Sequence, residues 1–139
     1  MKLSTKTHYG LRILMHIAID KRTNKRSCGK DISSRQGINE AYMEQLMISL
    51  KNASLVKTIR GRNGGYQLAK DAHLISLLEV VEAFEGPIDL TESSGTVPEQ
   101  VAANGIWLRL GEHIKKQVRA VNLDQIVDEG LQQSADYII

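Results

Sequence analysis

The segment from Leu55 to Ala69 restricts the fold of this chain more than any other. Its first part, Leu55-Val56-Lys57-Thr58-Ile59, is β-branched and alternating, and Tyr66-Gln67-Leu68-Ala69 is typical of a second short strand. Between them lies Arg60-Gly61-Arg62-Asn63-Gly64-Gly65, where the Asn-Gly pair is a strong hairpin signal because both residues tolerate a positive φ. The sequence therefore predicts a two-stranded hairpin with a cationic, glycine-rich tip.

Helical patterns precede this hairpin. From Thr5 to Ile19, apolar residues repeat at helical spacing and predict a first helix with one buried face: Tyr9, Ile13, Leu14, Ile17 and Ala18. The polar stretch from Asp20 to Ser27 is typical of a loop whose Lys and Arg side chains are solvated or contact phosphates. Ser27 is then a suitable N-cap for a short second helix over residues 28–36.

A glycine-containing turn separates this second helix from a third. Gly37 can take a positive φ, and Asn39 can cap a helix that ends near Ala53. Four apolar residues of the third helix recur at helical spacing and form one stripe: Met43, Leu46, Met47 and Leu50. Two short helices joined by a tight turn with glycine are typical of a helix-turn-helix.

A basic hairpin directly after a helix-turn-helix is typical of a wing. Arg60 and Arg62 at its tip can reach phosphates or a narrow minor groove, and the glycines allow a close backbone approach to DNA. The alternative is a glycine-rich cradle for a nucleotide phosphate. That alternative needs a Lys-Ser/Thr pair and a helix directly after the glycines, and the sequence offers neither.

Charge is divided unevenly between the two halves of the chain. Residues 1–72 hold 14 Lys and Arg against 5 Asp and Glu, a balance of +9, whereas residues 73–139 hold 4 against 11, a balance of −7. The net charge of +2 hides this difference. A segregated basic half indicates a polyanion binder, although a dipolar domain with ordinary solvated charges has the same pattern.

The second half of the chain begins with a capping box, Ser76-Leu77-Leu78-Glu79, which opens a fourth helix that Gly86 ends. We expect its apolar face to hold Leu77, Val80, Val81 and Phe84. Residues 88–99 have loop composition, and Asn122 begins a capped turn into a last short helix.

A long helix over residues 100–121 carries five apolar residues near heptad spacing: Trp107, Leu110, Ile114, Val118 and Val121. Such a seam indicates a partner helix, and a symmetric operator requires a two-fold protein. The alternative is packing against its own domain. We expect a mostly α fold with a small hairpin wing, divided into a DNA-binding domain at 1–86 and a linker, dimerisation helix and tail at 87–139.

Composition excludes several other classes of protein. Cys28 is the one cysteine, so no internal disulfide can form, and the apolar run from Leu11 to Ile19 is too short to span a bilayer. With no signal peptide evident, we expect a cytoplasmic protein with no membrane partner. The four histidines are scattered and match no catalytic motif, so we expect no enzyme activity. A winged helix used for protein contacts is the remaining alternative.

The sequence resembles the Rrf-type winged helix-turn-helix transcriptional regulators. The resemblance rests on four stretches, namely the opening Met1–Lys6 with Tyr9-Gly10-Leu11-Arg12, the core Ile32–Ile38 with Tyr42–Leu46, the hairpin Leu55–Ala69, and the closing Glu82-Ala83-Phe84-Glu85-Gly86. It is specific from Met1 to Gly86 and looser beyond, where Trp107 and Leu123 still fit the family's dimerisation helix and its end.

The resemblance implies a homodimeric binder of double-stranded operator DNA, usually a repressor. The implied base-reading positions lie on the third helix and the implied wing contacts in the hairpin: Asn39, Ala41, Tyr42, Glu44 and Gln45, then Arg60, Gly61, Arg62, Gly64 and Gly65. The chemistry agrees, because Gln45 can pair with adenine, Glu44 can accept from cytosine, and Tyr42 offers a hydroxyl to a phosphate. Ordinary surface positions on an amphipathic helix remain the alternative for Tyr42 and Gln45.

The sequence departs from the cluster-binding members of this family. Those relatives hold an iron–sulfur centre with three closely spaced cysteines before the dimerisation helix, whereas residues 88–106 here contain no Cys and no His. His8 lies where some relatives place a ligand, yet a lone histidine is more often an ordinary surface or core residue. We therefore expect no metal and no cofactor.

Two routes for a signal remain open. Cys28 lies near the start of the second helix, beside Arg26 and Lys30, where a thiolate is favoured, so a thiol-based redox switch is one hypothesis and a small, partly buried residue is the other. A small effector could bind at the loop 88–99 or at the dimer interface, although nothing in the sequence identifies it.

Overall fold

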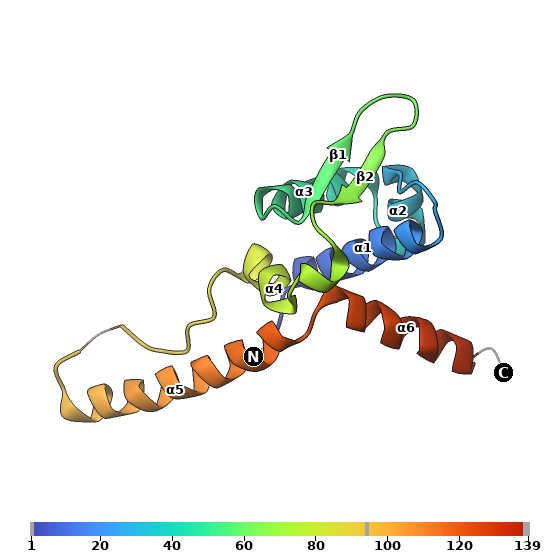
Figure 1. The fold of residues 1–139 in the computed structure, drawn as a ribbon. Coiled ribbons are helices and arrows are strands. Elements are labelled where there is room, and N and C mark those ends of the chain that lie inside the picture. The colour runs from blue at the N-terminus through green and yellow to red at the C-terminus, as the bar shows by residue number, and fades with distance from the viewer. Residues whose placement is uncertain (1, 94, 138–139) are drawn as a thin grey trace.

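The computed structural model of the chain describes residues 2–93 and 95–137. Its elements in chain order are α1 (Thr5–Arg22), α2 (Gly29–Gln36), α3 (Glu40–Asn52), β1 (Val56–Ile59), β2 (Gly65–Leu68), the short 3₁₀ helix η1 (Ala72–Leu74), α4 (Leu77–Glu85), α5 (Pro98–Ala120) and α6 (Leu123–Tyr137). Figure 1 shows a helical body from which the hairpin projects on one side and α5 on the other. The predicted mostly α fold with a hairpin wing and a long C-terminal helix is confirmed.

The core forms where α1 crosses the helix-turn-helix. Ile13, Leu14 and Ile17 of α1 are buried against the α3 stripe predicted from the sequence, Met43, Leu46, Met47 and Leu50. Removing these side chains from water supplies most of the driving force that holds α3 in place. The opposite face of α3 is consequently free for solvent or a ligand.

The turn between α2 and α3 has the predicted geometry. Gly37 has a φ of 70° and ends α2, and the Asn39 side chain accepts a hydrogen bond from the Tyr42 N–H at 2.7 Å. A side-chain acceptor at the N-cap satisfies one of the free N–H groups of the first turn. The orientation of α3 relative to α2 is thereby set locally.

The start of α2 differs from the prediction. Cys28, not Ser27, is its N-cap, and Cys28 makes no side-chain cap. Ser27 has other partners, because its carbonyl accepts from the Tyr66 N–H at 2.8 Å and its hydroxyl donates to the Asp20 carboxylate at 2.7 Å. The first helix also runs three residues past Ile19, and Arg22 at its end pairs with the acidic side chains of α6.

The hairpin pairs Val56 with Leu68 and Ile59 with Gly65, which leaves residues 60–64 as its tip. The hairpin is as predicted, but the reason given for its turn is wrong. Neither Asn63 nor Gly64 has a positive φ; Gly61 has one, at 104°, and the Gly64 N–H donates to the Gly61 carbonyl at 2.9 Å. The tip is thus longer than a two-residue turn on Asn-Gly.

The capping box of α4 is confirmed. The Ser76 side chain accepts from the first turn while the Glu79 carboxylate accepts from the Ser76 N–H, and Gly86 ends the helix. The buried residues of α4 are Leu78, Val80 and Val81, whereas Leu77 and Phe84, which the pattern placed on the apolar face, are half-buried. Leu78 is buried although the pattern did not place it on the apolar face.

The last helix is longer than expected and returns to the core. α6 has 15 residues, begins with reciprocal hydrogen bonds between Asn122 and Gln125, and buries Leu123 and Val127. It packs against α1, where Arg22 donates to the carboxylates of Asp124 and Asp128, each at 2.6 Å. The division of the chain at residue 86 stays a prediction, and α6 nevertheless shares the core of the first half.

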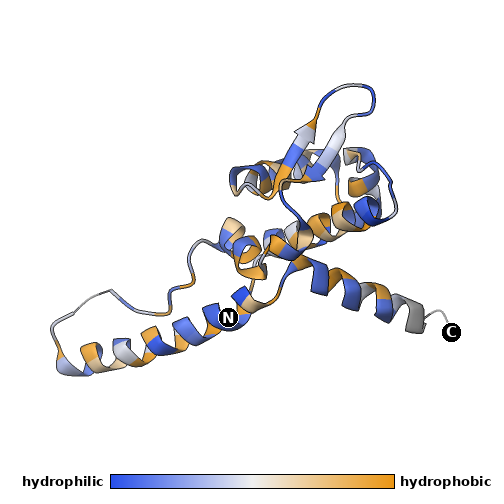
Figure 2. Cartoon of the chain, viewed as in Figure 1, coloured by the Kyte–Doolittle hydropathy of each residue, from blue (hydrophilic) through white to orange (hydrophobic). Residues whose placement is uncertain are grey.

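The long helix α5 is largely uncovered. Gly111 is its buried residue, and the loop that precedes it runs back along it, with the Asn104 amide hydrogen-bonded to both backbone groups of Glu92. Apolar residues recur along this projecting helix in Figure 2. In the part of the chain that the structure describes, no helix combines the length and apolar character needed to cross a membrane.

Candidate DNA-binding surface

The solvent face of α3 carries the side chains predicted to read bases. Ala41, Glu44 and Gln45 are exposed, opposite the buried stripe of the same helix. Asn39 is exposed as well, but its side-chain oxygen is engaged in capping the helix. An exposed, N-terminally capped helix with amide and carboxylate groups near its start has the form of a recognition helix.

Tyr42 lies between this face and the core. Its ring is half-buried and meets the Tyr9 ring edge-on, with ring centroids 6.0 Å apart, while the Arg12 guanidinium lies 4.7 Å from the Tyr9 centroid. Such aromatic and cation–π contacts stabilise by about 0.5–1.5 kcal/mol each. Tyr42 therefore fixes the first turn of α3 against α1, in addition to any contact with a phosphate.

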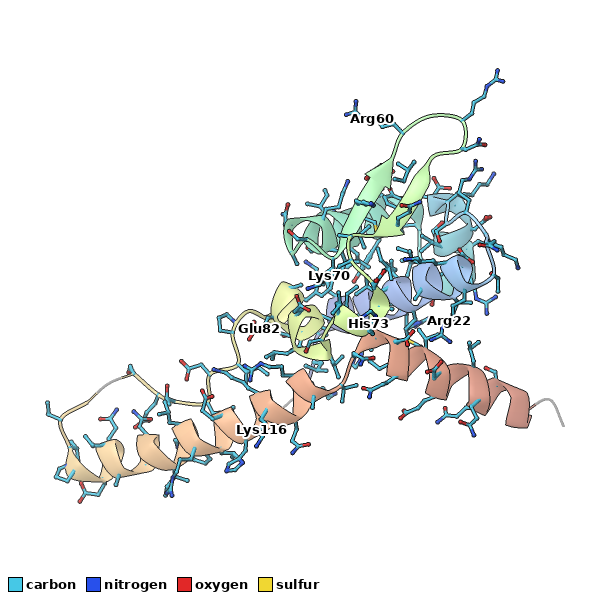
Figure 3. The ribbon with its side chains drawn as sticks, viewed as in Figure 1. Arg22, Arg60, Lys70, His73, Glu82 and Lys116 are labelled. Atoms are coloured by element: carbon cyan, nitrogen blue, oxygen red, sulfur yellow. The ribbon has the colours of Figure 1, made fainter. Side chains whose placement is uncertain are left out.

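The two wing arginines are exposed at the hairpin tip, together with Gly61 and Asn63. Figure 3 shows the Arg60 side chain directed away from the helical body. The backbone carbonyl of Arg62 accepts a hydrogen bond from Arg26 Nη1 at 2.7 Å, so one side of the tip is tied to the loop between α1 and α2.

Two tip glycines have close neighbours within the protein. A Cβ at Gly64 would lie 2.3 Å from the Ile59 carbonyl oxygen, and one at Gly65 would lie 2.3 Å from that of Ser27. Contacts this short with backbone atoms force the chain to move. Gly64 and Gly65 thus have an intramolecular reason to lack a side chain, and their contact with DNA stays a proposal.

The wing and α3 form one surface. Lys51 Nζ on α3 lies 3.5 Å from Thr58 Oγ1 on β1. Burial raises the pKa of the Tyr66 hydroxyl on β2, and the nearby Glu44 carboxylate of α3 raises it further. Figure 1 shows the hairpin beside α3, so the predicted base-reading and wing residues lie on adjoining elements.

The cations of this surface are free of acidic partners. Within residues 2–93 and 95–137, ion pairs join Lys21 to Asp71, Lys70 to Glu79, Lys115 to Glu112, His16 to Asp20, and Arg22 to the two aspartates of α6. Arg60 and Arg62 take part in none of them. Unpaired guanidinium groups on an exposed loop attract a polyanion through long-range and direct electrostatic contact.

The comparisons with known proteins identify the family of this chain. A family model described as Rrf2, iron-dependent transcriptional regulator, matches residues 3–129. The chain belongs to the Rrf2 family. It is 34% identical over 126 residues to the HTH-type transcriptional regulator CymR of Bacillus subtilis, covering 91% of this chain and 89% of that protein. It is also 32% identical over 133 residues to the HTH-type transcriptional regulator IscR of Vibrio campbellii, covering 93% and 79%.

The solved structures show the same fold. The structure of CymR, the global cysteine regulator of B. subtilis, superposes with a TM-score of 0.77 at 32% identity, covering 93% of this chain and 98% of that one. This Rrf2 protein is a DNA-binding transcriptional regulator of the helix-turn-helix type and not an enzyme, as its sequence predicted.

The donor groups of this Rrf2 chain do not fit an iron–sulfur centre, despite the family's iron-dependent description. Thiolates are the ligands that such clusters need, and Cys28, the one thiol, lies at the start of α2, far from the loop before α5 in Figure 1. That loop uses its polar groups otherwise, since Asp89 accepts from Thr91 and Gln100 donates to Ser93. Within the described residues, no three Cys, His, Asp or Glu side chains gather as metal ligands.

The predicted dimerisation residues divide into two groups. Trp107 and Leu110 are exposed, with 44% of each residue's reference area open to solvent. Ile114 and Val118 are half-buried and line an apolar cavity of about 430 Å³ together with Leu11, Leu77, Val80 and Val81. Val121 is the C-cap of α5, and its carbonyl accepts from the Leu77 N–H at 2.8 Å.

Sequence patterns missed the contribution of the loop between α1 and α2. Arg26 and Ser27 lie far from the hairpin in sequence but contact Arg62 and Tyr66 in the fold. The only local signal was the basic composition of this loop, which does not distinguish a solvated cation from one that holds a neighbouring element. His8 is exposed, and Cys28 is partly exposed at the N-cap of α2.

Proposed function

We propose that this chain represses transcription as a homodimer that binds a palindromic operator, without an iron–sulfur cluster. One observation carries the proposal most directly: an exposed recognition helix and an unpaired arginine wing adjoin on one side of the molecule, while a helix with exposed apolar residues projects from the other. The first surface suits a duplex and the second suits another copy of the chain.

In this proposal the α3 face enters the major groove. Gln45 donates to and accepts from adenine, Glu44 accepts from the cytosine amino group, and Ala41 gives close approach. The Tyr42 hydroxyl contacts a phosphate, and the N-terminus of α3, which Asn39 caps, lies near the phosphates. The hairpin tip lies along the adjacent backbone or narrow minor groove, with Arg60 and Arg62 as its cations and Gly61, Gly64 and Gly65 shaping the loop.

The dimer in this proposal forms through α5. Five apolar residues in the N-terminal half of this helix are exposed: Val101, Ile106, Trp107, Leu108 and Leu110. Exposed apolar side chains in this number on an otherwise polar helix are typical of a protein–protein interface. A second copy that buries it would place two wings and two recognition helices on one duplex, about one helical turn apart.

The absence of a cluster in this proposal follows from the donor set described above. The signal must then reach the protein by other means, and a small effector at the loop before α5 or at the dimer interface is the simplest of them.

Redox control through Cys28 is a second hypothesis. The thiol lies partly exposed at the N-cap of α2, next to Ser27, whose backbone pairs with the wing. An oxidised sulfur there would add a polar group between the helix-turn-helix and the wing. We would compare operator affinity of the native chain and Cys28→Ser with and without peroxide; an unchanged oxidant response in the variant eliminates the switch.

The proposed function is tested by footprinting the protein on genomic DNA and measuring its mass in solution. We expect a dimer, protection of an inverted-repeat site that overlaps a promoter, and lower transcription from that promoter in its presence. A monomer that protects no DNA at low ionic strength would overturn the proposal. Protection with raised transcription would retain DNA binding and reject repression.

A further inference from the structure

We propose that Arg26 is a positioning residue for DNA binding: by holding the carbonyl of Arg62 it fixes the wing against the loop between α1 and α2. The inference rests on the proposed function and adds a residue that contacts the wing, not the base pairs. It concerns how the arginine tip is presented to the duplex.

Arg26 contacts the wing directly. Arg26 Nη1 donates to the Arg62 carbonyl oxygen at 2.7 Å, which is a short, charge-assisted hydrogen bond. It acts at the hairpin tip, beyond the last strand pair, Ile59 with Gly65. The five tip residues lie outside the strand ladder, and the Gly64 N–H closes the loop on the Gly61 carbonyl without attaching it to the helices. The bond at Arg62 therefore ties the residues that carry the arginines to the loop between α1 and α2.

The loop that carries Arg26 is itself anchored. The residue after it, Ser27, forms an isolated bridge to Tyr66, with the Tyr66 N–H donating to the Ser27 carbonyl at 2.8 Å. The Ser27 hydroxyl donates to Asp20, and the same carboxylate oxygen lies 3.1 Å from His16 Nε2 on α1. Because His16 and Ser27 are buried, the attachment is to the core and not to a mobile surface group.

Gly65 permits this arrangement. A Cβ there would lie 2.3 Å from the Ser27 carbonyl oxygen and 3.4 Å from Arg26 Cγ, so only glycine lets the strand approach the loop so closely. Gly65, which the sequence analysis placed among the DNA contacts, is thus also needed for the close approach of the hairpin to Arg26.

The hairpin has room to move if this contact is lost. A cavity of about 260 Å³ lies between the loop and the hairpin, lined by Ile17 on α1 and by Asn63, Tyr66 and Gln67 of the hairpin. A closely packed hairpin would be held by packing alone, whereas one with open space behind it depends on specific bonds. Arg26 supplies such a bond. The tip is then already ordered in the free protein, so the entropic cost of ordering it does not weaken DNA binding.

The experiment uses the full chain and three variants, Arg26→Ala, Arg26→Lys and Lys25→Ala. Lys25 is the matched control, since it is the neighbouring cation and its side chain makes no hydrogen bond or ion pair in the described part of the chain. We would measure amide hydrogen exchange of residues 61–66 in the free protein, then the Kd for the footprinted operator at several salt concentrations.

For Arg26→Ala we expect faster exchange at Gly64 and Tyr66 and a Kd raised about 3- to 10-fold, as for the loss of one hydrogen bond. The salt slope should stay at the native value, because a positioning residue releases no counterion. Arg26→Lys keeps a donor and should recover part of both effects. Lys25→Ala should leave exchange unchanged.

Unchanged amide hydrogen exchange in Arg26→Ala would overturn the inference. A salt slope of DNA affinity reduced by about 0.9 would overturn it as well, because that reduction indicates a lost phosphate contact. Faster amide exchange with an unaltered Kd would overturn it too, because the restraint on the tip would then have no effect on DNA binding. Failure of the native chain to bind any operator would instead reject the proposed function, and the exchange data from the free protein keep the two failures apart.

Discussion

The hairpin tip and α5 both project from the same helical core, yet they expose opposite chemistry. The tip presents Arg60 and Arg62, and α5 presents Trp107, Leu110 and their apolar neighbours. These side chains are exposed, so none of them is needed to build the core. The difference teaches that each projection is built for a different partner, a charged one at the hairpin and an apolar one at the helix.

The largest expected effect separates the two regions by ionic strength. Neutralising six to ten phosphates should lower DNA affinity by roughly 10³–10⁵-fold between 50 and 200 mM salt. Burial of apolar α5 residues depends little on salt, so the dimer mass should stay the same over that range. Fluorescence anisotropy and sedimentation measure the two quantities. A flat DNA curve would favour a winged helix that binds protein.

The next effect is on α5 alone. Trp107→Glu combined with Leu110→Glu should give a monomer, because two carboxylates would have to be desolvated in the interface. Operator affinity should then fall by roughly 10²–10⁴-fold, since the two half-sites are no longer bound by one linked pair. Light scattering and anisotropy report both. The control is Lys116→Glu on the same helix, an exposed position outside the seam, which should remain dimeric.

Substitutions at the tip should act on DNA binding without changing the dimer. Gly64→Val places a side chain against the Ile59 and Gly61 carbonyl oxygens and must distort the turn, so we expect at least about a tenfold loss of operator affinity. Gly105→Ala is the control, because a Cβ there meets nothing within 4 Å. If Gly64→Val bound DNA normally, the tip would not be part of the contact surface.

Arg60→Ala should cost roughly 1–3 kcal/mol of binding, provided this residue reads a base or a narrow groove. Arg109→Ala removes the same charge from the exposed face of α5 and should change operator affinity little. Competition binding against the footprinted site measures both. Equal losses in the two variants would mean that net charge, not the wing, governs affinity.

The smallest effect concerns the start of α4, in the helical body between the two projections. Burial, the largest influence on Glu79, would raise its pKa, but hydrogen bonds from Lys70 and from the Ser76 N–H together hold the pKa below its ordinary value of 4.5. A lowered folded-state pKa stabilises the protein above pH 4.5, and that contribution is lost as the pH falls through the folded value.

Glu79→Gln should therefore reduce stability at pH 7 by less than about 1 kcal/mol, as for exposed ion pairs, and should match the native chain near pH 3. Glutamine preserves the capping box, so the change isolates the charge. Thermal unfolding between pH 3 and 7 checks this, with the exposed Glu82→Gln as control. Dimer mass and wing contacts should be unaffected.

The sequence by itself determined the features whose causes are local. The buried stripe of α3, the Asn39 cap, the positive φ of Gly37 and the capping box of α4 each involve residues within seven positions of one another. Their spacing is therefore visible in the chain. The existence and place of the hairpin were also determined, although Gly61 rather than Asn63 makes the turn.

Only the tertiary structure decided which distant segments meet. Arg26 and Ser27 contact a hairpin nearly forty positions away, and α6 packs against α1 through the ion pairs of Arg22. Ile114 lines a cavity beside α4, whereas Trp107 on the same helix is exposed. The physical reason is that such contacts depend on how elements pack around a shared core. A loop rich in cations has the same local sequence whether it is solvated or holds a wing.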